Sequence, residues 1–178
     1  MTAEIALGIV IILVLLVWLA LSKANRLDLL HQKVAKTGAT LNAQLLRRAG
    51  LAAELAVSGY LDPASSLIVA EAADVCLTHD GEDADSLGLV ESELSRALRQ
   101  AVEGEREGPD PDAPRLVQDV MQAWKRVGLA RRFHNDAVAQ VRRMRAQGIV
   151  RILHLAGRAE IPATFEMDDA PPRGWWTS

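Results

Sequence analysis

The chain opens with one unbroken apolar run and then continues as stretches in which apolar residues recur every three or four positions. The run from Ile5 to Leu21 contains no charged residue, and as a helix rising 1.5 Å per residue it spans about 26 Å. That length lies at the short end of what crosses a bilayer. The pattern therefore predicts a transmembrane anchor over residues 1–22, with residues 5–21 in contact with the lipid bilayer.

A cleaved signal peptide and a buried core helix are the two alternatives to an anchor. A signal peptide begins with a basic region and ends at a small-x-small site, whereas residues 1–4 hold no Lys or Arg and the run ends in Leu-Ser-Lys-Ala over 21–24. A buried helix of this length rarely lacks a polar face. The sequence therefore favours an anchor that is retained.

Four helical stretches are predicted after the anchor from apolar spacing, glycine and proline. They run from Lys23 to about Gly59, from Pro63 to Thr78, from about Asp85 to Glu103, and from Asp112 or Ala113 to about Gln147. Asp62 is a good N-cap and the proline after it a good first helical residue. The apolar positions of the first stretch are Leu27, Leu30, Val34, Leu41, Leu45, Leu51 and Leu55.

No stretch alternates with the period of two that is typical of strands, and most of the connecting loops are short. The predicted fold is all-α: an N-terminal transmembrane helix followed by an antiparallel bundle of about four helices, two of them long. The bundle covers residues 23–166, and residues 167–178 are expected to be a disordered tail.

Charge divides the bundle into an acidic and a basic part. Asp62 to Asp112 carries 14 acids and 3 bases, whereas Arg115 to Arg158 carries 10 bases and 2 acids. Complementarity between neighbouring helices would explain this division. The alternative is a basic helix that faces a polyanion or an acidic membrane surface.

The orientation of the anchor follows from the basic residues beside it. Lys23, Arg26, Lys33 and Lys36 follow the run, and no Lys or Arg precedes it. The positive-inside rule then places the C-terminal domain in the cytoplasm, on the inner (plasma) membrane.

Motifs of known chemistry are missing from the sequence. The single cysteine excludes a disulfide framework, and Cys76-Leu-Thr-His79 offers only half of a metal site. The sequence contains no Gly-x-Ser-x-Gly, P-loop or dinucleotide-binding turn. We expect no enzymatic activity, metal or cofactor. Nucleic-acid binding is also not expected, because the basic stretch offers few aromatic residues for stacking.

A basic amphipathic segment over residues 142–158 is the candidate for contact with lipid headgroups. Part of it, from Gly148 to Arg158, places basic side chains at i, i+3 and i+7 on one helix face. The same part could instead pack as a lid on the end of the bundle. The candidate lipid-facing residues are Arg142, Arg143, Arg145, Arg151, His154 and Arg158.

The stretch Ala-Arg-Arg-Phe-His-Asn-Asp-Ala-Val over residues 130–138 resembles the Ala-Arg-x-Phe-Tyr-Asn-x-x-Val signature of the LemA family. Asn25-Arg26-Leu27, Gln-Leu-Leu-Arg-Arg over 44–48 and Phe165-Glu166 are similar to further segments of that family, in the same order. The histidine of the signature stretch stands where the family usually has Tyr. The signature positions, with no role assigned, are Arg131, Phe133, His134, Asn135, Asp136 and Val138.

The resemblance implies one N-terminal anchor, a small cytoplasmic domain of long helices and no established enzymatic activity. We therefore expect a non-enzymatic interaction or scaffold module that binds an unidentified membrane or cytoplasmic protein, with homo-oligomerisation left open. The alternative is a lipid-sensing or membrane-remodelling module that uses residues 142–158. A hydrolase is a third hypothesis, and it would need a cleft near His134 and Asp136.

Overall fold

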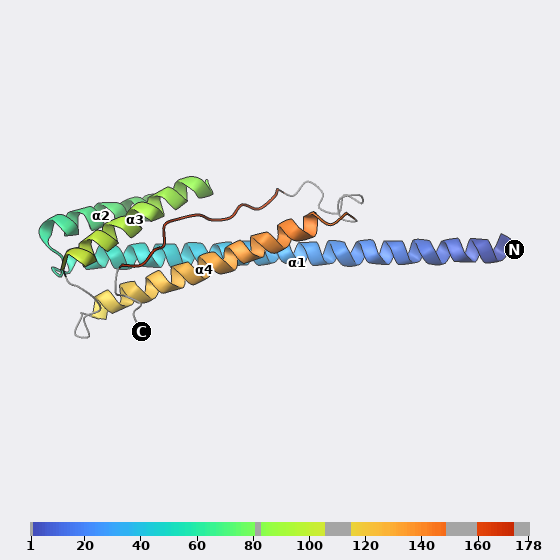
Figure 1. Ribbon diagram of the computed structural model, residues 1–178, viewed down its shortest axis with the longest axis horizontal. Helices are drawn as coiled ribbons and strands as arrows, with labels where there is room; N and C mark the ends of the chain where they lie inside the picture. Colours follow the sequence, from blue (N-terminus) through green and yellow to red (C-terminus); the bar gives the residue numbers. More distant parts are fainter. Residues whose placement is uncertain (1, 81–82, 106–114, 149–159, 173–178) are drawn as a thin grey trace. The chain divides into compact units, whose positions relative to one another are not determined.

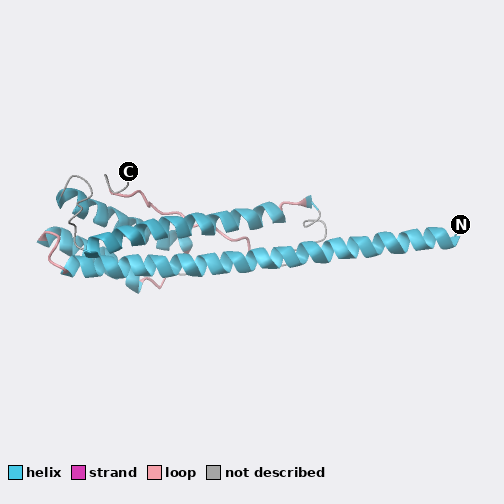
Figure 2. Cartoon of the chain, turned by 90° about the horizontal axis from the view of Figure 1, so that it is seen from below, coloured by secondary structure: helices cyan, strands magenta, loops and turns pink. Residues whose placement is uncertain are grey.

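A computed structural model describes residues 2–80, 83–105, 115–148 and 160–172. These ranges form four α-helices and contain no strand (Figures 1 and 2). The helices are α1 (Thr2–Val57), α2 (Pro63–Thr78), α3 (Ala84–Glu105) and α4 (Arg115–Arg145). The all-α prediction is confirmed, with a long apolar helix near the N-terminus followed by a helical bundle.

The connection from α1 to α2 follows the predicted turn. Gly59 has φ +77, a left-handed conformation that costs glycine little, and it lies just beyond the end of α1. The Asp62 side chain then accepts hydrogen bonds from the backbone N–H groups of Ala64 (2.9 Å) and Ser65 (3.2 Å), with Pro63 as the first helical residue. The predicted N-cap of α2 is confirmed.

Contacts divide the chain into two compact units. The first unit comprises residues 1–36 and 136–164, and the second comprises residues 37–135 and 165–178. The helices α1 and α4 each contribute to both units. This division differs from the predicted one, in which the anchor ends at residue 22 and one bundle follows.

The first unit has a small core between α1 and α4. Leu27, Val141 and Met144 are buried and form one cluster, against which Leu30 and Val34 pack. Two hydrogen bonds join the same helices, from Lys23 Nζ to Gln147 Oε1 (3.0 Å) and from Lys33 Nζ to Gln140 Oε1 (3.1 Å). Numbers rise along α1 as they fall along α4, so the two helices are antiparallel in this unit.

The start of α1 is apolar on every side and is not covered by the chain. Among the described residues, α1 is the one helix long and apolar enough to cross a membrane, and none of its apolar window is buried. The large apolar side chains from Ile5 to Trp18 are 50–63% exposed. A buried core helix does not fit this exposure, because its apolar side chains would be covered by the rest of the protein.

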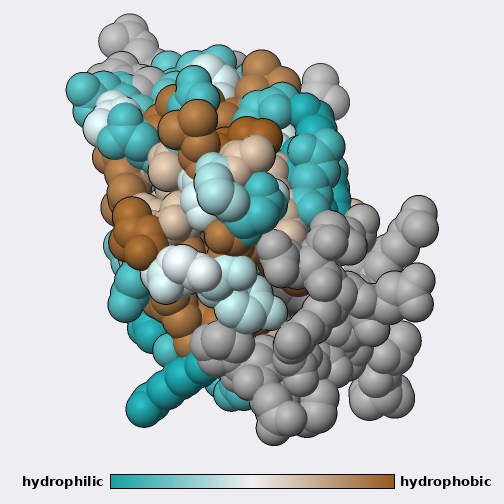
Figure 3. Space-filling model, turned by 90° about the vertical axis from the view of Figure 1, so that its left-hand side faces the viewer, coloured by the Kyte–Doolittle hydropathy of each residue, from teal (hydrophilic) through white to brown (hydrophobic). Residues whose placement is uncertain are grey.

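The second unit contains the larger core. Its buried apolar residues include the predicted stripe positions Leu41, Leu45 and Leu55 of α1, together with Leu94 and Leu98 of α3. Around them pack the buried residues Ala49, Ala52, Ala56, Leu61, Val69, Ala73, Cys76, Ala97, Ala101, Val117, Val120, Trp124, Val127, Ala130 and Phe165. Figure 3 shows apolar residues also reaching the surface among polar ones at the end where α1 gives way to α2.

Candidate functional site

The C-terminal strap, defined as residues 165–172, is held by the signature stretch of α4. The Asn135 side chain bonds the backbone of Phe165 twice: Oδ1 accepts from its N–H (2.9 Å) and Nδ2 donates to its carbonyl (3.1 Å). The Phe165 ring is 5% exposed and belongs to the cluster that contains Leu41 and Val127. An asparagine inside a helix competes for backbone hydrogen bonds, and this one bonds a different backbone segment.

Two arginines hold the acidic part of the strap. Arg99 of α3 forms an ion pair with Asp168 and donates to the carbonyl of Ala170 (2.7 Å). Arg131 of α4 donates to Asp169 Oδ2 from Nη2 at 2.8 Å and from Nε at 3.1 Å. Hydrogen bonding from Arg99 lowers the pKa of Asp168 below its ordinary value of 3.8. Asp168 is therefore bound as an anion, and Asp169 is held by a forked pair of hydrogen bonds from Arg131.

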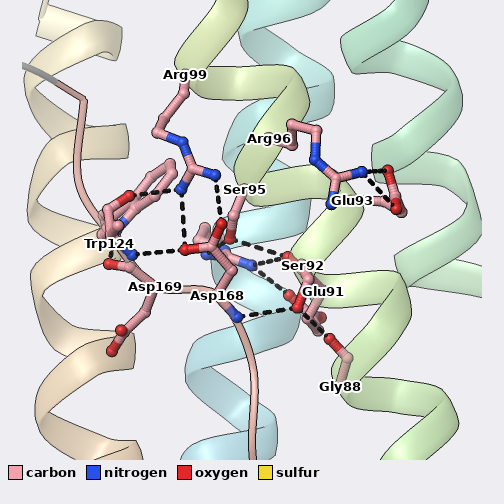
Figure 4. Close-up of polar contacts among 12 residues, drawn as sticks. Gly88, Glu91, Ser92, Glu93, Ser95, Arg96, Arg99, Trp124, Asp168 and Asp169 are labelled. Atoms are coloured by element: carbon pink, nitrogen blue, oxygen red, sulfur yellow. Dashed lines mark hydrogen bonds and ion pairs between the residues drawn. The ribbon is translucent and has the colours of Figure 1, made fainter.

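Other side chains of α3 and α4 form hydrogen bonds with backbone groups of the strap (Figure 4). Ser92 Oγ accepts from the N–H of Asp168 (2.9 Å), and Trp124 Nε1 donates to the carbonyl of Asp169 (2.9 Å). At Gly88 the strap passes so close that an added Cβ would overlap the carbonyl oxygen of Glu166. Only glycine leaves room for this approach of two backbones.

The strap corrects the sequence prediction for residues 167–172. A disordered tail was expected over residues 167–178, but residues 167–172 lie along α3 and α4 and are bound through side chains and backbone. The physical reason is that partners for the acidic pair come from arginines far away in the sequence. Residues 173–178 lie outside the described residues.

A charged pair lies in the core of the second unit. Arg48 of α1 donates from Nη2 to Glu91 Oε2 of α3 at 2.6 Å, and the two residues are 0% and 1% exposed. Arg48 also donates to Ser95 Oγ (2.9 Å) and to the carbonyl of Glu91 (3.0 Å). Its guanidinium carbon lies 5.2 Å from the centre of the Trp124 ring. These contacts offset part of the cost of burying the charges, while the buried Nε of Arg48 has no hydrogen-bond partner among the described residues.

The cysteine beside this pair is buried and unreactive. Cys76 is 3% exposed, and its Sγ lies 3.6 Å from the carbonyl of Val90. Burial, and then the nearby Glu91 carboxylate, raise the pKa of the thiol to about 12. The thiol is therefore protonated at neutral pH and is a poor nucleophile.

The other signature residues have separate positions. In the second unit, Phe133 is 63% exposed, and His134 Nδ1 lies 3.4 Å from Thr37 Oγ1. In the first unit, Asp136 is exposed and Val138 is buried. The signature therefore combines residues that bind the strap, a core residue and exposed residues.

The candidate lipid-facing arginines of α4 also divide into two groups. Arg142 Nε donates to the carbonyl of Pro162 (3.1 Å), and Arg145 Nη1 donates to that of Glu160 (3.1 Å), so both hold the segment before the strap. Arg143 instead lines a hollow of the first unit together with Arg26. The other three candidates, Arg151, His154 and Arg158, lie outside the described residues.

A hollow of about 330 Å³ lies where the strap meets α4, and the described residues that line it are Trp124, Lys125, Gly128, Leu129, Arg132, Asp169, Ala170 and Pro171. This lining supplies no Ser, Thr, Cys or His as a nucleophile or base. Within the described ranges, no group of three or more His, Cys, Asp or Glu side chains could hold a metal ion.

The sequence reasoning missed the charged residues of the core and of the strap. Arg48 follows Leu45 by three positions, and Glu91 follows Leu87 by four, so both lie on apolar helix faces. A charge of each sign on such faces is a signal for a buried ion pair.

Comparisons with protein-family models, curated proteins and solved structures find no match for this chain.

Proposed function

We propose that the chain is a single-pass, membrane-anchored interaction module whose helical domain lies on the cytoplasmic face of the inner (plasma) membrane. Its support is the uncovered apolar start of α1, followed by Lys23, Arg26, Lys33 and Lys36 without a basic residue before it. Because α1 runs on into the second unit, retention of the anchor would tether that unit directly.

The observation that carries the interaction role is the outer face of α2. Leu67, Ile68 and Val75 are 69%, 52% and 45% exposed, and they lie opposite the buried side of the same helix. Two acids, Glu71 and Asp74, lie among them on this face and are exposed. A helix that is apolar on both sides is typical of one that contacts a further surface. The partner would offer an apolar centre with basic residues at its rim.

A non-enzymatic role agrees with the way the polar groups are used. The conspicuous polar side chains of the signature, Arg131 and Asn135, are engaged in holding the strap. The two stretches that carry the LemA resemblance in α4 and at Phe165-Glu166 contact each other, since Arg131 Nη1 also lies 3.6 Å from Glu166 Oε2. This contact supports a structural role for the signature and is the basis on which we propose a LemA-type domain.

Photo-crosslinking in intact membranes tests the interaction role. A photoreactive residue at Leu67 is expected to give a discrete adduct, whereas the same residue at the exposed Gln100 of α3 is not. The adduct should weaken with Ile68→Asp, which places a charge in the apolar face. An adduct of twice the chain mass would identify the partner as a second copy. Absence of an adduct at Leu67, or identical adducts at both positions, would contradict the proposal.

The orientation is tested with an engineered terminal thiol. A Ser178→Cys variant should resist a membrane-impermeant thiol reagent in intact cells and react after lysis. The native Cys76 adds little background because it is buried. Labelling of the variant without lysis would place the domain on the other side of the membrane.

The lipid-sensing alternative is favoured by one observation, the hollow beside the anchor that contains Arg26 and Arg143. In that reading the cationic side chains at the membrane surface would contact anionic lipid while the outer face of α2 binds the protein partner. The two roles are compatible in one molecule.

A further inference from the structure

A hollow of about 290 Å³ lies in the first unit between α1 and α4. Its described lining consists of two arginines, two glutamines and two apolar residues: Arg26, Leu30, Gln140, Arg143, Met144 and Gln147. This lining has no carboxylate. It therefore combines hydrogen-bond donors with an apolar wall, a composition suited to a ligand that is anionic at one end and apolar at the other.

Two lysines orient the glutamines so that both offer donors. Lys23 Nζ donates to Gln147 Oε1 at 3.0 Å, and Lys33 Nζ donates to Gln140 Oε1 at 3.1 Å. Because each carbonyl oxygen already accepts from an ammonium group, the amide NH₂ of each glutamine is the group left to donate. The polar part of the lining thus presents guanidinium and amide donors, and the lysines add positive charge beside them.

The hollow lies at the level of the lipid headgroups if the apolar run spans the bilayer. Arg26 follows Leu21 by five residues, which is about 8 Å along a helix, and the headgroup layer on each side of the hydrocarbon core is about 5–8 Å thick. Leu30 is one turn further from the bilayer. The arginines are therefore within reach of a lipid phosphate.

We propose that this hollow binds the headgroup of an anionic phospholipid, with Arg26 and Arg143 on the phosphate. Guanidinium groups match phosphate oxygens in a forked arrangement. A zwitterionic headgroup fits less well, because its ammonium group would enter a site that carries several cations and no carboxylate. The proposal rests on the proposed membrane anchoring and names the lipid class that the anchored domain selects.

Native mass spectrometry of the full-length protein in a non-ionic detergent tests the site. Phosphatidylglycerol and phosphatidylcholine are titrated separately, and the fraction of protein that retains one lipid is measured. We expect tighter retention of phosphatidylglycerol, and for Arg26→Gln/Arg143→Gln a loss on the order of 30-fold, given the usual contribution of two basic residues near anionic lipid.

A charge-matched variant serves as the control. Arg47→Gln/Arg126→Gln also removes one exposed arginine from α1 and one from α4, but both of these belong to the second unit. Its retention of phosphatidylglycerol should stay within about twofold of the unaltered protein, since surface charges outside a site contribute little. Equal losses in the two variants, or equal retention of the two lipids, would overturn the proposal.

A further arm separates a lipid site from a site for free phosphate. Inorganic phosphate added in excess should leave the bound phosphatidylglycerol in place, because the acyl chains of the lipid also hold it in the detergent around the apolar start of α1. Displacement of the lipid by inorganic phosphate would assign the hollow to the free ion and would reject the lipid. The same preparations show whether the protein was recovered from membranes, so failure of the site is distinguishable from failure of the anchor.

Discussion

The start of α1 and the charged pair of the core depart from the usual distribution of side chains in opposite directions. From Ile5 to Trp18 large apolar side chains are 50–63% exposed, whereas Arg48 and Glu91 are 0% and 1% exposed. Soluble proteins cover apolar helices and leave most charges in water. Both regions include residues of the same helix, α1. Whether a side chain of α1 is buried therefore depends on which segments, distant in the sequence, pack against it.

The two regions differ in the contacts that their side chains make within the chain. The buried guanidinium has its carboxylate, a serine hydroxyl and an aromatic ring within the second unit. The apolar run has no cover among the described residues, and it is long and apolar enough to cross a bilayer. Substitutions can test this contrast from both sides.

The largest effect is expected from breaking the buried pair. Glu91→Leu would leave the guanidinium of Arg48 uncompensated in the core and should lower the free energy of unfolding by about 3–5 kcal/mol. The double variant Arg48→Met/Glu91→Leu should regain most of this loss, because no unpaired charge remains. Urea denaturation of the full chain in detergent, followed by circular dichroism, measures both. Equal stability of the single variant and the unaltered chain would show that the pair is not buried.

The next largest effect is expected from a leucine-to-alanine substitution, which we compare at two positions of α1. Leu45→Ala, at a residue 1% exposed, should destabilise the bundle by about 2–5 kcal/mol through lost contacts and a cavity. Leu13→Ala, at a residue 55% exposed, should change the same unfolding transition by less than about 0.5 kcal/mol. A similar loss at both positions would contradict the contrast, since it would mean that the apolar run packs against the bundle.

Two glycine-to-alanine substitutions, one against the strap and one away from it, are expected to change stability in opposite directions. Gly88→Ala would push against the backbone of Glu166 and should cost about 1–3 kcal/mol, although alanine favours helix. Gly50→Ala meets nothing within 4 Å and should gain up to about 1 kcal/mol. Thermal unfolding of the two variants checks the signs. Hydrogen exchange at residues 165–172 should rise for Gly88→Ala alone, and a stabilising Gly88→Ala would indicate that the strap does not dock there.

The smallest effect concerns pH. The folded-state pKa of Asp168 is depressed, so its pairing with Arg99 contributes stability above pH 3.8, its ordinary value, and loses that contribution as the pH falls through the lower folded pKa. Arg99→Gln should therefore lower the unfolding temperature slightly at neutral pH, and the difference from the unaltered chain should become smaller in strong acid, where the bond to the Ala170 carbonyl remains. An undiminished difference there would show that the pairing with Asp168 contributes nothing.

The sequence predicted the helices well because their signals are local. The apolar spacing located the buried Leu41, Leu45 and Leu55, and the Asp62-Pro63 pair located the start of α2. The pattern did not predict which side of α2 packs. Its largest apolar residues, Leu67 and Ile68, are exposed, whereas the smaller Ala73 and Cys76 are buried.

The strap could not be predicted in the same way because its signals are not local. Asp168 and Asp169 form an acidic, proline-flanked ending that resembles a disordered tail, and Arg99, the partner of Asp168, is 69 residues away from it. Asn135 is a signature position to which the sequence assigns no role, and only the fold shows that it binds the backbone of Phe165. A long-range pairing of this kind requires knowledge of which helices are neighbours.

Alkaline carbonate extraction of membranes that carry the full-length chain tests the central claim most directly. A helix that spans the bilayer stays in the membrane pellet, whereas a protein held by surface contacts is released. The unaltered chain should remain in the pellet, as should Leu46→Arg, which places a charge at a residue of α1 that is 44% exposed in the second unit. Leu13→Arg should be recovered less well, because an arginine at the centre of a span opposes insertion. Release of the unaltered chain into the supernatant would contradict the account.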